Sequence, residues 1–330
     1  MRFSVVGAGG WGTAIARLLA NAGHNTLLWA REDGLPETIA ADRENAAFLP
    51  GVELPAGNLT TTGLLQDTMD AEAVVLAPPS FGMAGILSQL SEYGAAPPVM
   101  INLAKGLDPT TRKTMSELIL SHFPETAAFT LSGPSHAEEV ARDMPTAVVL
   151  AGRDLELGEQ LQRELSTPRF RVYLSEDIRG VELCATVKNV IALASGIADG
   201  LGFGDNTRAA LITRGLAEMV RFGRAFDVSD ATFFGLSGLG DLVATCTSQH
   251  SRNRYVGQRL GCGEPLEAIL AEMTMVAEGI HATRIVQQIS QEKKIEMPIT
   301  DAVHRLLSGD ADPVSLVHEI MTRTPKREGA

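Results

Sequence analysis

Three glycines near the N-terminus have the spacing of a loop that binds a diphosphate. Gly7, Gly9 and Gly12 directly follow an apolar, strand-like run, and a helix-compatible segment begins at Thr13. The first glycine permits a tight turn, the second lets the backbone approach a phosphate, and the third lets helix and strand pack closely. Free N–H groups at the start of that helix favour a bound anion. The pattern predicts a dinucleotide site more strongly than a glycine-rich turn without a ligand.

The end of the second expected strand bears on which dinucleotide is bound. An Asp or Glu at this point, about 20 residues beyond the glycine loop, would bind the ribose hydroxyls of NAD. Arg31 stands there instead, and its planar guanidinium can pair with the 2′-phosphate of NADP. Glu32 and Asp33 follow at once and weaken that preference. We therefore expect NADP(H), NAD(H) or both as cofactor, with Arg31 favouring NADP.

Lys188 is the candidate for acid–base chemistry. It lies in a helix-compatible segment beside Val187 and Val190. Burial among apolar residues would lower its pKa, and a second cation such as Lys105 would lower it further, whereas Asp241, if close, would act in the opposite direction. A neutral amine can take the hydroxyl proton of an alcohol while hydride leaves the same carbon. The sequence leaves open that the side chain instead extends to solvent or forms a structural ion pair.

A second polar group, Ser251-Arg252-Asn253, precedes a helix-compatible run and forms a candidate phosphate site. A serine at the N-cap leaves free N–H groups at the helix start, and Arg252 adds a charged fork. The alternative is a capped helix with solvent-facing arginines. Asn189, next to the candidate base, could polarise a substrate oxygen or cap a neighbouring backbone group.

Ser135 and Glu138 have the S-x-x-E spacing of a capping box, which predicts a helix start and a structural role for both side chains. Gly133-Pro134 supplies the turn before it. A helix start at this point could also face an anion.

Two kinds of domain must position these residues. In the first half, apolar runs alternate with helical segments, as in a parallel sheet buried on both faces. The runs span 3–6, 27–30, 73–77, 99–103, 128–131 and 147–151. After Glu176 the segments are long and helical, notably 181–195, 207–226 and 282–292. We predict an α/β protein with a Rossmann-type doubly wound N-terminal domain, 1–176, and an all-helical substrate and catalytic domain, 177–330.

Composition excludes several classes of function. The 330 residues are 45% hydrophobic, which suits two domains with separate cores, and the net charge of −12 argues against nucleic-acid binding. No apolar run approaches the roughly 18 residues of a membrane span, and the N-terminus is typical of a first strand rather than a signal peptide. The three cysteines have no CxxC spacing and the histidines no ligand spacing, so we expect no metal, no disulfide framework and a cytoplasmic location.

Taken together, the motifs resemble the NAD(P)-dependent glycerol-3-phosphate dehydrogenase family over nearly the whole chain. The order and spacing of the matching stretches carry the resemblance. These stretches are 7–13, 45–51 (Asn-Ala-Ala-Phe-Leu-Pro-Gly), 103–106, 132–137, 187–190, 238–242, 245–247, 251–253 and 276–279. His136 departs from the pattern, since many members carry Phe there.

The resemblance implies interconversion of sn-glycerol 3-phosphate and dihydroxyacetone phosphate by hydride transfer, which supplies glycerol 3-phosphate for phospholipid synthesis. It implies that Lys188 accepts the proton and that Lys105 faces both substrate and cofactor. The other residues that it places against the substrate are Gly133, Ser135, Asp241, Ser251, Arg252 and Asn253. Besides the motif glycines and Lys105, the expected cofactor contacts are Gly10, Trp11, Arg31, Ala137, Arg252, Val276 and Glu278. A homodimer is compatible with the family.

Two other functions remain open from the residues alone. One is a dehydrogenase of the same plan that acts on a different phosphorylated or carboxylated alcohol; the arginine of the 251–253 segment favours a phosphate. The other is a dinucleotide-binding sensor without catalysis. The joint presence of Lys105, Lys188, Asp241 and Arg252 argues against a sensor, which would not need them.

Overall fold

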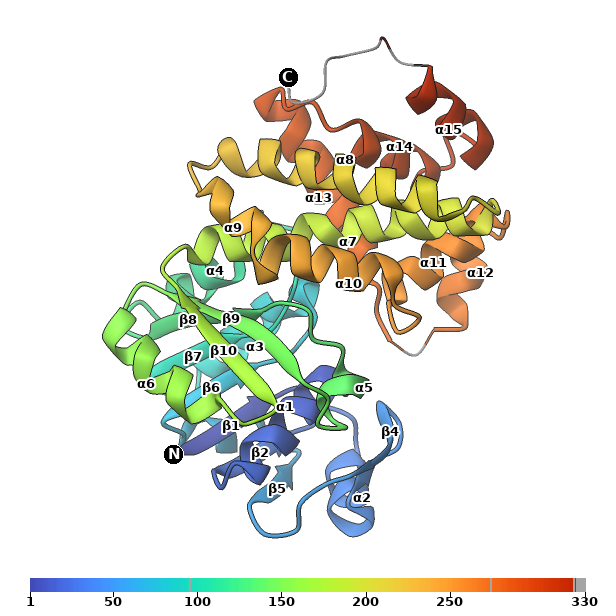
Figure 1. The fold of residues 1–330 in the computed structure, drawn as a ribbon. Coiled ribbons are helices and arrows are strands. Elements are labelled where there is room, and N and C mark those ends of the chain that lie inside the picture. The colour runs from blue at the N-terminus through green and yellow to red at the C-terminus, as the bar shows by residue number, and fades with distance from the viewer. Residues whose placement is uncertain (95, 274, 323, 325–330) are drawn as a thin grey trace.

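The computed structural model describes residues 1–94, 96–273, 275–322 and 324. It has a sheet domain built from the first half of the chain and a helical domain built from the second, and the two are stacked (Figure 1). This is the predicted fold class.

The sheet domain is built on eight strands in the order β10-β9-β8-β7-β6-β1-β2-β5. The strands are β1 (Arg2–Val6), β2 (Asn25–Trp29), β5 (Leu59–Thr62), β6 (Ala73–Leu76), β7 (Val99–Asn102), β8 (Ala127–Ser132), β9 (Thr146–Gly152) and β10 (Phe170–Ser175). All six predicted strands are confirmed. The two additional strands, β5 and β10, lie at the sheet edges, where one side is exposed and a continuous apolar run is not needed.

The expectation of a parallel sheet is wrong at one pair, because β8 and β9 are antiparallel. A parallel connection needs a crossover of a dozen or more residues, usually a helix. Between β8 and β9 the chain forms only the four-residue helix α5 (Ala137–Val140), so it returns beside β8 in the opposite direction. The remaining pairs of this sheet, including β9 with β10, are parallel.

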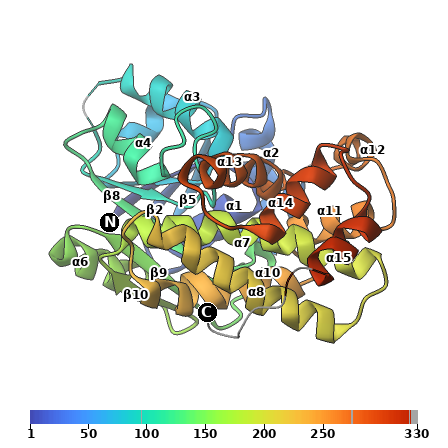
Figure 2. The same ribbon diagram turned by 90° about the horizontal axis from the view of Figure 1, so that it is seen from above.

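Helices cover both faces of the sheet (Figure 2). They are α1 (Gly10–Asn21), α2 (Leu35–Asp42), α3 (Ser80–Ser91), α4 (Met115–His122) and α6 (Leu155–Leu165), with a 3₁₀ turn η1 (Leu65–Met69). A small hairpin, β3 (Glu44–Asn45) with β4 (Leu49–Glu53), lies outside the sheet. The loops after β1, β7 and β8 leave the same edge of the sheet and carry Gly7, Lys105 and Gly133, so this edge is the expected ligand-binding edge.

The second half is helical, and no strand follows β10 in the part of the chain that the structure describes. The helices are α7 (Ile178–Gly200), α8 (Asp205–Arg224), α9 (Asp230–Phe234), α10 (Asp241–Thr247), α11 (Arg252–Gly261), α12 (Leu266–Ala271), α13 (Glu278–Lys293), α14 (Pro298–Leu307) and α15 (Pro313–Met321), with a π-helical turn η2 (Leu236–Gly240). The predicted helices at 181–195 and 282–292 lie in α7 and α13, and the one predicted at 207–226 corresponds to α8, which ends two residues earlier, at Arg224.

Helix α7 is the axis of the helical domain. By length and composition it could cross a membrane, with a mean hydropathy of 1.5 over 18 residues, but that whole window is buried inside the protein. It packs most extensively on α11, where a Cβ on Gly257 would lie 2.2 Å from the carbonyl oxygen of Leu193. Only glycine permits this approach of the two helices. Because its apolar window is fully buried, α7 is the core helix of the domain.

Candidate active site

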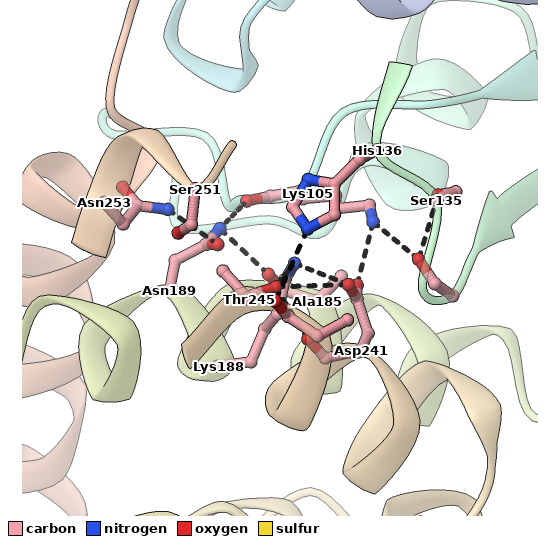
Figure 3. Close-up of polar contacts among 12 residues, drawn as sticks. Lys105, Ser135, His136, Ala185, Lys188, Asn189, Asp241, Thr245, Ser251 and Asn253 are labelled. Carbon is pink, nitrogen blue, oxygen red and sulfur yellow. Dashed lines mark hydrogen bonds and ion pairs between the residues drawn. The ribbon is translucent and has the colours of Figure 1, made fainter. Parts of the chain in front are cut away.

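Two lysines from different domains meet on one carboxylate (Figure 3). Lys105, after β7, donates to Asp241 Oδ2 at 2.8 Å, and Lys188, in the middle of α7, donates to Asp241 Oδ1 at 2.8 Å. The sequence separates Lys105 from Asp241 by 136 residues. The fold therefore brings together three of the predicted catalytic side chains at the boundary between the domains.

Asp241 is held by the turn that precedes it. The Gly-Leu-Gly segment forms the π-helical turn η2, and a Cβ on Gly238 would lie 2.1 Å from the backbone oxygen of Phe233. One helical turn after Asp241, Thr245 Oγ1 donates to the Asp241 carbonyl at 2.6 Å and accepts from Lys188 Nζ at 2.7 Å. Thr245 was not among the predicted site residues, although its spacing of four from Asp241 puts both residues on one helix face.

Burial and neighbouring charges determine the pKa values of Lys188 and Asp241, which the sequence left open. Lys188 is only 4% exposed, which rules out extension to solvent. Burial lowers the pKa of Lys188 to about 8, with the charge of Lys105 acting in the same direction and Asp241 opposing it. Burial alone would raise the pKa of Asp241, but the two lysines hold it below its ordinary value. At neutral pH Asp241 is therefore a carboxylate, and Lys188 is close enough to its pKa to give a proton to a substrate or take one from it.

Asn189 binds backbone and a second asparagine. Its Nδ2 donates to the Lys105 carbonyl at 2.9 Å, and its Oδ1 accepts from Asn253 Nδ2 at 2.9 Å. Asn253 Oδ1 in turn accepts from the backbone N–H of Gly279 at 2.9 Å. This chain of amides links α7, α11, α13 and the Lys105 loop. The contacts of Asn189 are therefore those of a side chain that binds a neighbouring backbone group, the second of the two roles that the sequence allowed.

The start of α11 has the predicted N-cap. Ser251 Oγ accepts from the N–H of Arg254 at 3.2 Å, and Ser251 is buried. The next side chain, Arg252, is exposed, and no hydrogen bond or ion pair to its guanidinium is formed by the described residues. Loss of solvent around the guanidinium lowers the pKa of Arg252, and the negative charges of Glu278 and Glu138 raise it. Arg252 is thus a solvent-accessible cation at the start of α11, within reach of the charges of Glu278 and Glu138.

The predicted capping box at Ser135 and Glu138 is wrong. Helix α5 begins at Ala137, with His136 at the N-cap and no side-chain cap. Ser135 Oγ donates to the carbonyl of Gly133 at 2.9 Å, which also accepts from Lys105 Nζ at 2.9 Å. The hydroxyl is therefore used to hold the loop against Lys105, which brings both predicted substrate residues of this loop to the site.

The glycine loop has the shape that a diphosphate needs. Gly7 has φ +111°, and a Cβ on Gly12 would lie 2.0 Å from the Gly7 carbonyl oxygen, so both positions require glycine. Beside Gly9 the space is open, with no atom within 4 Å of a Cβ built there. The indole Nε1 of Trp11 is buried and lacks a hydrogen-bond partner. This open cradle with an unpaired donor fits a dinucleotide.

Of the other predicted cofactor residues, Ala137 lies beside the glycine loop. Ala137 is adjacent to Gly10, 3.7 Å from where a Cβ on that glycine would lie. Arg31 is exposed and lies 3.5 Å from Glu32, a surface pair of little energetic weight. Val276 lines a pocket of about 280 Å³ bounded by α3, α12 and α13.

Glu278 also makes a contact between the domains that sequence analysis did not foresee. Its carboxylate accepts from the N–H and the hydroxyl of Ser80, at 2.7 and 2.5 Å. Burial raises the pKa of Glu278, with the hydrogen bonds from Ser80 and the charge of Arg252 opposing. The first residue of α13 is thereby fastened to the start of α3.

No group of three or more His, Cys, Asp or Glu residues that could hold a metal ion occurs among the described residues. The side chain of His136 lies with Nε2 3.4 Å from the carbonyl oxygen of Ala244. Burial lowers the pKa of His136, with the charges of Lys188 and Lys105 adding to the effect.

Comparison with known proteins agrees with this geometry. Residues 2–158 match the family described as NAD-dependent glycerol-3-phosphate dehydrogenase N-terminus, and residues 177–318 match the corresponding C-terminus. The glycerol-3-phosphate dehydrogenase [NAD(P)+] of Geobacter metallireducens is 47% identical and that of Desulfitobacterium hafniense 44%, over 99% of this chain and 98% and 93% of theirs. The crystal structure of glycerol-3-phosphate dehydrogenase from Coxiella burnetii is similar with a TM-score of 0.94 and 37% identity, covering 98% of this chain and 99% of that one.

Proposed function

The chain belongs to the NAD-dependent glycerol-3-phosphate dehydrogenase family, and we propose that Lys188 is the residue that gives and takes the proton when the substrate is reduced or oxidised. The enzyme interconverts sn-glycerol 3-phosphate and dihydroxyacetone phosphate by hydride transfer with NAD(P)(H). The observation that supports the assignment is the pair of lysines on buried Asp241, with the pKa of Lys188 at about 8.

Lys188 serves both directions of the reaction. In oxidation, its neutral amine takes the proton of the C2 hydroxyl; in reduction, its ammonium group gives a proton to the carbonyl oxygen. Asp241 and Thr245 hold Nζ in place, and the charge of Lys105 helps to keep the amine available. The nicotinamide, when bound, supplies or accepts the hydride.

We assign the cofactor to the glycine loop and to the other predicted contact residues. Gly7, Gly9, Gly10 and Gly12 would hold the diphosphate at the start of α1, with Trp11 Nε1 as an additional donor. The remaining predicted contacts are Arg31, Lys105, Ala137, Arg252, Val276 and Glu278. Domain limits of 1–176 and 177–330, a cytoplasmic location, a homodimer and the supply of glycerol 3-phosphate for phospholipids belong to the same proposal.

The first test is oxidation of NADPH and, separately, NADH by the purified protein after addition of dihydroxyacetone phosphate. We expect turnover with both and a higher kcat/KM with NADPH, and Arg31→Ala should reduce that preference. Because Arg31 is exposed and beside Glu32, its contribution should be modest, about tenfold or less. Cofactor binding without turnover would instead indicate a different substrate or a sensor.

The phosphate of the substrate should depend on Arg252. Its guanidinium is exposed at the start of α11, where backbone N–H groups also attract anions. Arg252→Ala should raise the KM for dihydroxyacetone phosphate about 10- to 100-fold, since a hydrogen bond to a charged group contributes roughly 1.5–3 kcal/mol. Arg252→Lys, which keeps the charge but not the fork, should lie between. An unchanged KM in the alanine variant would remove Arg252 from this role.

A further inference from the structure

The hairpin of β3 and β4, residues 44–53, has no part in the chemistry described so far, yet its first strand reaches the cofactor loop. Asn45 is 1% exposed, and its Nδ2 donates to the carbonyl oxygen of Ala8 at 2.7 Å and to Thr13 Oγ1 at 2.8 Å. Thr13 Oγ1 itself donates to the same carbonyl at 3.2 Å. Ala8 lies between the first two glycines of the motif, so two side chains hold one carbonyl inside the diphosphate loop.

The hairpin is fastened to the start of α1 by further contacts. A Cβ on Gly10 would lie 2.8 Å from the carbonyl oxygen of Phe48, so the tip of the hairpin lies against the loop backbone. Leu49 and Val52 of β4 pack with Ala14 of α1 in a small buried cluster that also includes α5, and β4 lies beside α1 and α5 in Figure 1. Asn45 is therefore held beside Ala8 by the packing of the hairpin on α1.

The planarity of the peptide unit gives this contact a consequence. The Ala8 carbonyl and the Gly9 N–H belong to one planar trans unit and point in opposite directions. Holding the carbonyl toward Asn45 therefore directs the Gly9 N–H away from the hairpin. Gly9 lies at the N-cap of α1 with open space around it, where an anion on the helix start would be bound.

The amide of Asn45 is not explained by packing. Its Oδ1 is buried and has no hydrogen-bond partner, an unfavourable arrangement that an apolar side chain would avoid. The half of the amide that is used is the half that binds Ala8 and Thr13. We therefore explain the presence of asparagine at position 45 by the hydrogen bonds that its Nδ2 donates, and not by its Oδ1.

We propose that Asn45 is a positioning residue for the cofactor: it sets the orientation of the Ala8–Gly9 peptide so that the loop receives the diphosphate without reorganisation. The inference rests on the proposed placement of the diphosphate on this loop. It concerns affinity for the dinucleotide and not the proton transfer at Lys188.

The test measures NADPH affinity directly, by calorimetry, together with kcat, KM and thermal stability. Asn45→Ala should raise the Kd and the KM for NADPH about tenfold, with kcat at saturating NADPH changed less than about threefold. Thr13→Val, which removes only the second donor at almost constant volume, should raise the Kd about threefold and keeps the test decisive if the Asn45 variant folds poorly.

Asn58→Ala is the matched control. Asn58 Nδ2 also donates to a carbonyl of α1, that of Ala20 at 3.3 Å, but at the opposite end of the helix. It should change stability without raising the Kd for NADPH. If Asn45→Ala and Thr13→Val leave the Kd at the value of Asn58→Ala, Asn45 only packs the hairpin and the proposal is overturned.

Gly9→Asp separates this failure from failure of the cofactor placement. If Gly9→Asp abolishes NADPH binding while Asn45→Ala and Thr13→Val bind normally, the role of Asn45 alone is wrong. If Gly9→Asp also binds NADPH normally, the diphosphate does not lie on this loop, and the placement on which the inference rests is wrong.

Discussion

Lys188→Met should lower kcat in both directions by about 10²–10⁴-fold, because it removes the acid–base group. Methionine keeps most of the buried volume, and Asp241 retains Lys105 as a charged partner at 2.8 Å, so the domain should still fold. The Kd for NADPH, measured by calorimetry, should change less than about threefold, since Lys188 is not among the proposed cofactor contacts. Lys293→Met, at an exposed position on α13, is the control and should retain full activity. Near-normal turnover in Lys188→Met would exclude Lys188 as the proton-exchanging group.

The pH dependence adds a second readout for the same residue. With a pKa of about 8, Lys188 is mostly protonated at pH 7 and mostly neutral at pH 9. Oxidation of glycerol 3-phosphate needs the neutral amine, so its rate should rise as pH increases through about 8; reduction needs the ammonium form and should fall over the same range. Both transitions should be missing from the residual activity of Lys188→Met. A wild-type profile that is flat between pH 7 and 9 in both directions would contradict the assignment.

Local patterns predicted the elements of the fold well because the parallel strands are buried on both faces. Strands such as β6 and β7 consist entirely of buried residues, and this produces apolar runs, broken in β7 only by its last residue, Asn102. The edge strand β5, Leu-Thr-Thr-Thr, has no such run and was not predicted. The direction of β9 depends on the length of a connection rather than on the strand itself, so the antiparallel pair with β8 was also missed.

The site was predicted as a set of residues but not as a set of contacts. Residue type made Lys188 a candidate for acid–base chemistry, and the family resemblance added Lys105 and Asp241, but their shared geometry arises from segments far apart in the chain. The bond between Glu278 and Ser80 spans 198 residues and leaves no local pattern. Ser135 shows that a local motif can also mislead. It has the spacing of a capping box with Glu138, but in the folded loop its hydroxyl donates to the Gly133 carbonyl instead.

Gly9→Asp should weaken cofactor binding by at least about 10²–10³-fold while leaving the protein folded. Gly9 is the N-cap of α1 with φ −65° and ψ 172°, a conformation that Asp adopts readily, and nothing lies within 4 Å of its Cβ. Asp is a preferred N-cap, so thermal stability should be unchanged or slightly higher. The carboxylate would, however, occupy the space in which the diphosphate is proposed to bind.

Charge, rather than bulk alone, should account for most of that loss. Two unit charges about 4 Å apart near a protein surface repel by roughly 4 kcal/mol, which corresponds to about a thousandfold in Kd. Gly9→Asn has nearly the same shape and capping ability without the charge, so it isolates this effect. We expect calorimetry with NADPH to show a loss for Gly9→Asp about 10²–10³-fold greater than for Gly9→Asn, and the difference to shrink as salt screens the repulsion. Equal affinities for the two variants, at low and high salt, would mean that no anionic group of the cofactor lies at this helix start.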